Sequence, residues 1–189
     1  YDGDKLRFLV RYDTTDGKAV TVSDAEADAE NGSKVAGFSD VHFDDYYAEA
    51  VKWAVEQGIT NGTSSTTFSP DATVTRAEAV TFLWRAAGAP EPVANHSSFS
   101  DVADTNAYYY KAVSWAVGQG IPNGMGGGQF GPKGTLTYDQ ILAFLCRAAG
   151  GDTGSDWTNG ALHWAAEEGL TDGLTFSPKA SCPRSDVVY

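Results

Sequence analysis

The chain alternates between stretches whose apolar residues recur every three or four positions and polar stretches rich in Gly, Ser and Thr. Tyr47, Val51, Ala54 and Val55 follow the i, i+4, i+7, i+8 spacing of one helix face. Gly58 follows them at the place where a left-handed residue ends many helices. The pattern predicts a first helix that buries one face.

A second periodic stretch comes after a polar loop that contains an Asn-Gly turn and the sequence "FSP". Thr75 is the predicted N-cap, and Glu78 three residues later completes a capping box. Ala79, Leu83 and Ala86 then share one face. The pattern therefore predicts a unit of two helices joined by an ordered loop.

This helix-loop-helix unit is written three times. Trp53 and Trp115 are related by an offset of 62 residues, which persists to the end of the second helices, and a third copy follows with three residues missing from its loop. A repeat at a fixed period defines the fold more strongly than any single element. The predicted repeats span residues 38–90, 99–150 and 156–189, and the last one is cut short inside its second helix.

One pair of short helices cannot cover its own apolar face, so the copies should pack together around a shared axis in a mainly α fold. Residues 1–36 differ, because alternating apolar and polar positions flank "TDGK" and an acidic stretch follows. We predict a β-hairpin-like tail of an upstream domain plus a linker there. With a start that lacks a signal-peptide pattern and an end within "DVVY", the chain is expected to be a piece of a longer protein.

Composition and motif content argue against several classes of function for this chain. A net charge of −12 argues against general binding to nucleic acid, and no apolar run approaches the roughly 20 residues that span a bilayer. Cys146 and Cys182 have no metal-ligand spacing and are expected to be buried thiols, and the three histidines form no ligand motif. No nucleophile, base and acid combination emerges, so we expect no metal, no cofactor and no catalysis in this segment.

Arg76 is the unusual charge, because it stands in the first turn of a predicted helix. The helix dipole mildly disfavours a cation there and favours an anion. The position therefore indicates an arginine that points outward to meet a carboxylate, which it could hold through two parallel hydrogen bonds. The alternative is a solvated charge that pairs with Glu78 or with a carboxylate of a neighbouring repeat.

The order of motifs "FSDV", "WAVEQGITNG", "FSP", "VTRAEAV" and "FLWRAAG" resembles the S-layer homology domain family over residues 38–189. The resemblance implies a pseudo-threefold spindle of three repeats around a central three-helix bundle, in which first helices lie at the centre and second helices splay outward. It also implies grooves between repeats that bind anionic secondary cell-wall polysaccharides, often carrying a pyruvate ketal. The expected location is extracellular, in a bacterial cell wall or surface layer.

By the same resemblance, the arginine of the family's "TRAE" motif falls on Arg76 in the first repeat and on Arg184 in "PRSD" of the third. Tyr138 takes its place in the second repeat, which predicts an altered groove there.

Further candidates are aromatic rings that could stack on sugars and turn glycines that could bring amides close to a ligand, namely Trp53, Trp115, Trp164, Tyr46, Tyr108, Trp157, Gly62, Gly124 and Gly173. Core packing is the alternative for the tryptophans. Asp40 and Asp101 are expected to cap or turn the chain ahead of the first helices, as Thr75 and Glu78 do for the second.

Together these features favour a non-catalytic module that anchors a surface protein to a cell-wall polysaccharide. The alternative is a structural module in which degenerate grooves serve protein–protein assembly or self-association in a surface layer. An enzyme whose active site lies upstream is compatible with either.

Overall fold

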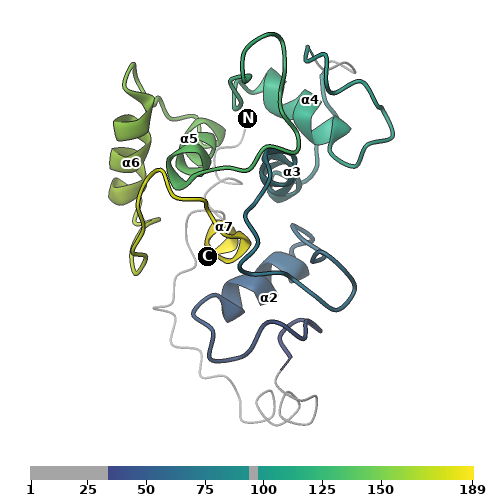
Figure 1. Ribbon diagram of the computed structural model, residues 1–189, viewed down its shortest axis with the longest axis vertical. Helices are drawn as coiled ribbons and strands as arrows, with labels where there is room; N and C mark the ends of the chain where they lie inside the picture. The colour runs from purple at the N-terminus through teal and green to yellow at the C-terminus, as the bar shows by residue number, and fades with distance from the viewer. Residues whose placement is uncertain (1–33, 94–97) are drawn as a thin grey trace. The chain divides into compact units, whose positions relative to one another are not determined.

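A computed structural model describes residues 34–93 and 98–189 as a mainly α-helical protein (Figure 1). The described residues contain six helices and isolated β-bridges but no regular strand. The helices are α2 (Ala48–Glu56), α3 (Arg76–Ala86), α4 (Tyr110–Gly118), α5 (Tyr138–Ala148), α6 (Trp157–Glu167) and α7 (Arg184–Val188). The hairpin-like segment predicted for residues 1–36 lies almost wholly outside the described residues.

The helices divide between two compact units. The larger unit consists of Thr73–Cys182 and holds α3 to α6, and the smaller unit consists of residues 34–72 with Pro183–Tyr189 and holds α2 and α7. The first and third repeats are thus each divided between the units, whereas the second repeat lies wholly within the larger unit.

The helix ends follow the sequence prediction closely. At the start of α3, the Glu78 amide donates to the Thr75 hydroxyl at 3.2 Å and the Thr75 amide donates to the Glu78 carboxylate at 2.9 Å. The Thr137 amide donates to Gln140 Oε1 at 3.1 Å at the start of α5. Both predicted capping boxes are confirmed.

In the larger unit the main helix contacts are α3 with α4, α5 with α6 and α3 with α5. The expectation that first helices occupy the centre is wrong for this unit, because the second helices α3 and α5 contact each other and bury most of their residues. By contrast, α6 buries only Ala161 and Ala165 among its residues.

A ring of three backbone hydrogen bonds explains this arrangement. The Val74 amide donates to the Cys182 carbonyl at 3.1 Å, the Cys182 amide to the Leu136 carbonyl at 3.0 Å, and the Leu136 amide to the Val74 carbonyl at 3.0 Å. Each residue comes from a different repeat and stands two positions before the first residue of a second helix. The helices α3 and α5 therefore both start from this ring.

The smaller unit packs α2 against α7 over a core of Val35, Phe38, Val41, Val51 and Phe68. The five-residue helix α7 has Pro183 at its N-cap and no side-chain cap. Instead, the amides of Arg184 and Ser185 donate to the carbonyls of Ala72 and Pro70 at 2.9 and 3.1 Å. Backbone carbonyls of the first repeat's loop thus accept the amide hydrogen bonds at a helix start that lacks a threonine cap.

The two cysteines are free and buried, as the sequence predicts. Burial raises the pKa of the Cys146 thiol, so this thiol is less reactive than an exposed one. Within the described part of the chain, no helix is both long enough and apolar enough to cross a bilayer.

Candidate functional site

The loop between the two helices of each complete repeat is fixed by an aspartate from the "FSDV" motif. The carboxylate of Asp101 accepts the amides of Phe130 and Gly131, both at 2.8 Å, and Asp40 accepts the amide of Phe68 in the same way. These aspartates were expected either to cap the first helices or to form turns, and the capping role is wrong, because α2 and α4 begin without a side-chain cap. Their role is to shape the loops.

Arg76 lies against the loop that Asp101 shapes. Its Nε donates to the Phe130 carbonyl at 2.7 Å and its Nη2 donates to the Asn123 carbonyl at 2.9 Å. The guanidinium carbon lies 4.9 Å from the ring centre of Phe130 and 5.3 Å from that of Phe144, which are cation–π distances. With only 6% of its surface exposed, Arg76 is held in place and does not point freely outward as expected.

The first three backbone amides of α3 already donate hydrogen bonds to oxygens of the protein. The Arg76 amide donates to the Gly134 carbonyl at 2.8 Å and the Ala77 amide donates to the Pro132 carbonyl at 3.1 Å, while the next amide binds the hydroxyl of Thr75. The argument that an anion binds these helix amides therefore fails. Any anion site here depends on side-chain cations.

A cavity of about 340 Å³ opens beside Arg76. Its lining residues come from all three repeats, and they are Arg76, Asn123, Gly124, Met125, Thr135, Gln140, Ala143, Phe144, Arg147 and Trp157. No aspartate or glutamate is among them, although the chain carries 25 acidic residues. The lining of this cavity is therefore positively charged, although the protein as a whole is acidic.

Two guanidinium groups supply that charge. Burial lowers the pKa of Arg76 while the nearby carboxylate of Asp101 acts in the opposite direction, and an arginine remains protonated even so. The Asp101 oxygens already accept two loop amides. The second guanidinium is that of Arg147, near the end of α5.

The predicted glycines have packing reasons that the structure makes explicit. A Cβ at Gly124 would lie 2.7 Å from the ring of Phe99, and one at Gly62 would lie 2.4 Å from the Thr67 carbonyl. Gly124 lines the cavity, whereas Gly62 and Gly173 have φ angles of 78° and 82° that favour glycine.

The predicted aromatic platforms separate into different environments. Trp115 is only 4% exposed and is a core residue rather than a surface for a sugar, whereas Trp164 is half-buried and packs against the core between α5 and α6. Trp53 is half-buried on α2 in the smaller unit. Trp157 lines the cavity, and the structure thus brings together Arg76, Gly124 and Trp157 from the sequence candidates.

Arg184 repeats the arrangement of Arg76 within the smaller unit. Its Nε donates to the Phe68 carbonyl at 2.9 Å, and its guanidinium carbon lies 5.1 Å from the Phe68 ring centre. Only 2% of its surface is exposed. The two family arginines therefore play the same structural part, each holding the buried loop phenylalanine of another repeat.

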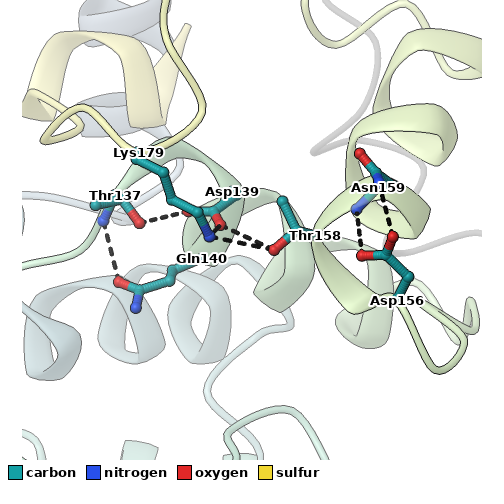
Figure 2. Close-up of polar contacts among 7 residues, drawn as sticks. All are labelled: Thr137, Asp139, Gln140, Asp156, Thr158, Asn159 and Lys179. Atoms are coloured by element: carbon teal, nitrogen blue, oxygen red, sulfur yellow. Dashed lines mark hydrogen bonds and ion pairs between the residues drawn. The ribbon is translucent and has the colours of Figure 1, made fainter.

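In the second repeat, the ring of Tyr138 stands where the other repeats have arginine and contacts the loop phenylalanine of the third repeat. It stacks on Phe176 with ring centres 4.5 Å apart and an interplanar angle of 17°. Next to it, the fully buried carboxylate of Asp139 accepts hydrogen bonds from Lys179 at 2.5 Å, Thr158 at 3.1 Å and Thr137 at 2.5 Å (Figure 2). An aromatic stack and an ion pair thus join the second repeat to the third.

Burial alone would raise the pKa of Asp139, but the hydrogen bonds from Lys179, Thr137 and Thr158 outweigh it and hold the pKa below its ordinary value. The unfolded chain therefore binds more protons below about pH 4, near the ordinary aspartate pKa, and this site loses its stabilising effect as the pH falls.

We expect Asp139→Asn to lower the free energy of unfolding by about 1–2 kcal/mol at pH 7, discounted because Lys179 is 68% exposed. The deficit should shrink as the pH falls from 7 toward 3, because protonation of Asp139 in the unfolded chain then favours unfolding of the parent. Urea unfolding at both pH values measures it, with Asp172→Asn at an exposed position as the control. An equal deficit at both values would contradict the assignment.

Sequence reasoning missed Arg147 and Met125 as cavity residues. Arg147 and its repeat equivalent Arg85 both fit the dipole at a helix C-terminus, so their sequence contexts do not distinguish them. Only the packing of α5 beside the loop of its own repeat places Arg147 in the cavity. The described residues also contain no group of three or more side chains suited to hold a metal ion.

The S-layer homology domain model matches residues 37–80 and 98–142, which carry the two Asp-shaped loops and the starts of α3 and α5. The chain belongs to the S-layer homology (SLH) domain family. The match covers most of each of the first two repeats.

The relatives that the chain matches include two surface proteins and an endoglucanase. A "Cell surface protein" of Thermoanaerobacter kivui is 36% identical over 161 residues, which are 79% of this chain and 20% of the relative. An "Endoglucanase" of Bacillus sp. (strain KSM-635) is 34% identical over 63% of this chain and 12% of its own length. A "Surface-layer 125 kDa protein" of Lysinibacillus sphaericus is 28% identical over 75% and 13%. The SLH chain thus spans a fifth or less of these three relatives.

Proposed function

We propose that this SLH chain anchors a larger bacterial surface protein, without catalysis, by binding an anionic cell-wall polysaccharide in the cavity beside Arg76. The observation that carries the proposal is the cavity's lining, which contains arginine and no acidic residue on a chain of net charge −12. A carboxylate is favoured in such a place because cations and apolar walls surround it. The names of two relatives support an extracellular location at the cell surface.

The pyruvate ketal is the anionic group that fits the lining best. It carries a carboxylate beside a methyl group, and the cavity offers guanidinium groups beside the apolar surfaces of Met125, Phe144 and Trp157. Amide and carbonyl groups of Asn123 and Gln140 could accept or donate hydrogen bonds to sugar hydroxyls. Recognition would then combine charge, an apolar contact and directional hydrogen bonds.

We further infer that the three repeats follow one pseudo-threefold plan with three inter-repeat positions of unequal chemistry. The equivalent contacts of Arg76 with Phe130, Tyr138 with Phe176 and Arg184 with Phe68 support this plan. The position at Tyr138 is proposed to serve as a structural joint. The cavity at Arg76 is the proposed primary ligand site, with Arg184 as the second candidate.

Co-sedimentation with purified cell-wall polysaccharide tests the proposal. The parent should sediment with the pyruvylated polymer and remain in solution with the same polymer after mild acid removal of the ketal. Arg76→Met keeps the length of the buried side chain but removes its charge and its hydrogen bonds to the Phe130 and Asn123 carbonyls, and should raise the apparent Kd for the polymer about tenfold, because the cavity loses positive potential and the support of its loop.

Thermal unfolding of Arg76→Met checks that the variant is folded at the assay temperature. A parent that ignores the ketal, or that fails to sediment with any such polymer, would overturn the anchoring proposal.

The second candidate function is a structural module for assembly within a surface layer. The stack of Tyr138 on Phe176 and the Lys179–Asp139 pair favour it, because they replace an arginine position with a joint between repeats. Sedimentation velocity over a wide concentration range distinguishes the two. Self-association without polymer binding would support assembly, whereas a monomer that binds polymer would support anchoring.

A further inference from the structure

Arg147 lines the cavity, and neither the helix dipole nor the "TRAE" motif explains why its side chain lies there. It stands in the last turn of α5, where a cation suits the helix dipole, yet its side chain lines the same cavity as Arg76. The equivalent Arg85 ends α3 and is not among the residues that line this cavity. The two arginines thus share a sequence context but have different surroundings.

The hydrogen bonds of Arg147 are long compared with those of Arg76. Its Nη1 donates to the Ile121 carbonyl at 3.2 Å and its Nη2 to the Thr153 hydroxyl at 3.3 Å, against 2.7 and 2.9 Å for Arg76. Both contacts lie at the long end of the normal hydrogen-bond range, and both acceptors are uncharged. The Arg147 guanidinium is therefore held by weaker contacts than that of Arg76.

The charge of Arg147 is also uncompensated by its surroundings. Across residues 34–93 and 98–189, no carboxylate lies within ion-pair distance of it. Its side chain is half-buried, so water screens it less than a fully exposed cation. A half-buried guanidinium that donates only to uncharged acceptors and has no carboxylate in ion-pair distance is well suited to bind a ligand carboxylate through two parallel hydrogen bonds.

We propose that Arg147 is the direct contact for the ligand's carboxylate, and that Arg76 acts mainly by positioning the Phe130 loop and adding positive potential. The inference rests on the proposed polysaccharide-binding function and assigns its anion contact to a residue outside the "TRAE" motif. The substrate class that follows is a sugar unit with one carboxylate beside an apolar group. The apolar group would contact Trp157 and Phe144.

Calorimetric titration with two small probes tests the assignment. The probes are a methyl glycoside that carries a pyruvate ketal and the uncharged methyl ester of that ketal. For Arg147→Gln we expect 10- to 100-fold weaker binding of the acid and little change for the ester, because only the acid loses a charge-assisted contact.

Arg147→Lys should recover part of the loss, since it restores charge but not the planar fork. Arg85→Gln, the matched control that removes the same charge at the equivalent helix position, should stay within twofold of the parent. The salt dependence of acid binding should weaken in Arg147→Gln alone.

The possible failures are distinguishable. If Arg147→Gln binds the acid as tightly as the parent does, the assignment is wrong and the anchoring proposal stands. Equal losses for acid and ester, or equal losses in Arg85→Gln, would indicate a structural or long-range charge effect and also overturn the assignment. If the parent binds neither the acid nor the pyruvylated polymer, both the assignment and the proposed function fail.

Discussion

Phe130→Ala should destabilise the larger unit by about 3–5 kcal/mol and remove ligand binding at the cavity. The Phe130 ring is completely buried, and loss of a buried aromatic ring leaves a cavity that the surroundings fill only in part. The same ring supports the Arg76 guanidinium at 4.9 Å. One substitution therefore removes both core packing and the support of a site residue.

Urea unfolding followed by tryptophan fluorescence measures the stability loss, and co-sedimentation at low temperature measures binding. Met125→Ala is the control, because this neighbouring side chain is 65% exposed and its removal should leave stability within about 0.5 kcal/mol of the parent. A Phe130→Ala variant as stable as the parent would show that the loop does not need its buried ring.

Gly160→Ala should destabilise the larger unit by about 2–3 kcal/mol, against the expectation from helix propensity. Gly160 lies inside α6, where alanine is normally preferred by about 1 kcal/mol. A Cβ there, however, would lie 2.0 Å from the Thr153 carbonyl oxygen and 2.7 Å from the Thr153 carbonyl carbon. These are backbone atoms, so the segment before α6 must move away from the helix, at the cost typical of overpacking.

Gly118→Ala is the matched control for this prediction. Gly118 is also a helical glycine of the larger unit, but it has no heavy atom within 4 Å of an added Cβ. It should leave stability unchanged or raise it by up to about 1 kcal/mol. Thermal unfolding of the two variants should therefore shift in opposite directions, and a stabilised Gly160→Ala would show that Thr153 does not pack against α6.

Local signals in the sequence were sufficient for the helices. The capping boxes at Thr75 and Thr137 and the glycine ends depend on residues close in sequence, and all of them are present in the structure. The register of the repeats also depends only on a pattern that the chain displays directly. Such features are predictable because their physical causes lie within a few residues of each other.

Features that depend on contacts between repeats were not predictable in the same way. In sequence, Asp101 resembles a cap for the helix that follows it. Its carboxylate oxygens instead accept hydrogen bonds from backbone amides 29 and 30 residues away. Gly160 replaces Glu49 and Lys111 of the other repeats, and only the path of residues near Thr153 explains why. The prediction that Arg76 points outward failed for the same reason, because it considered only the helix that carries Arg76 and not the loop of the second repeat.

The ring formed by Val74, Leu136 and Cys182 limits how such a protein can evolve and mature. An open array of repeats gains or loses members one at a time, because each repeat contacts only its neighbours. A closed ring needs all three of its segments, because the loss of any one leaves the other two with an unmatched donor and an unmatched acceptor. The hydrogen bond of the ring that spans the most sequence joins Val74 to Cys182, so the ring cannot close during synthesis until the third repeat has emerged.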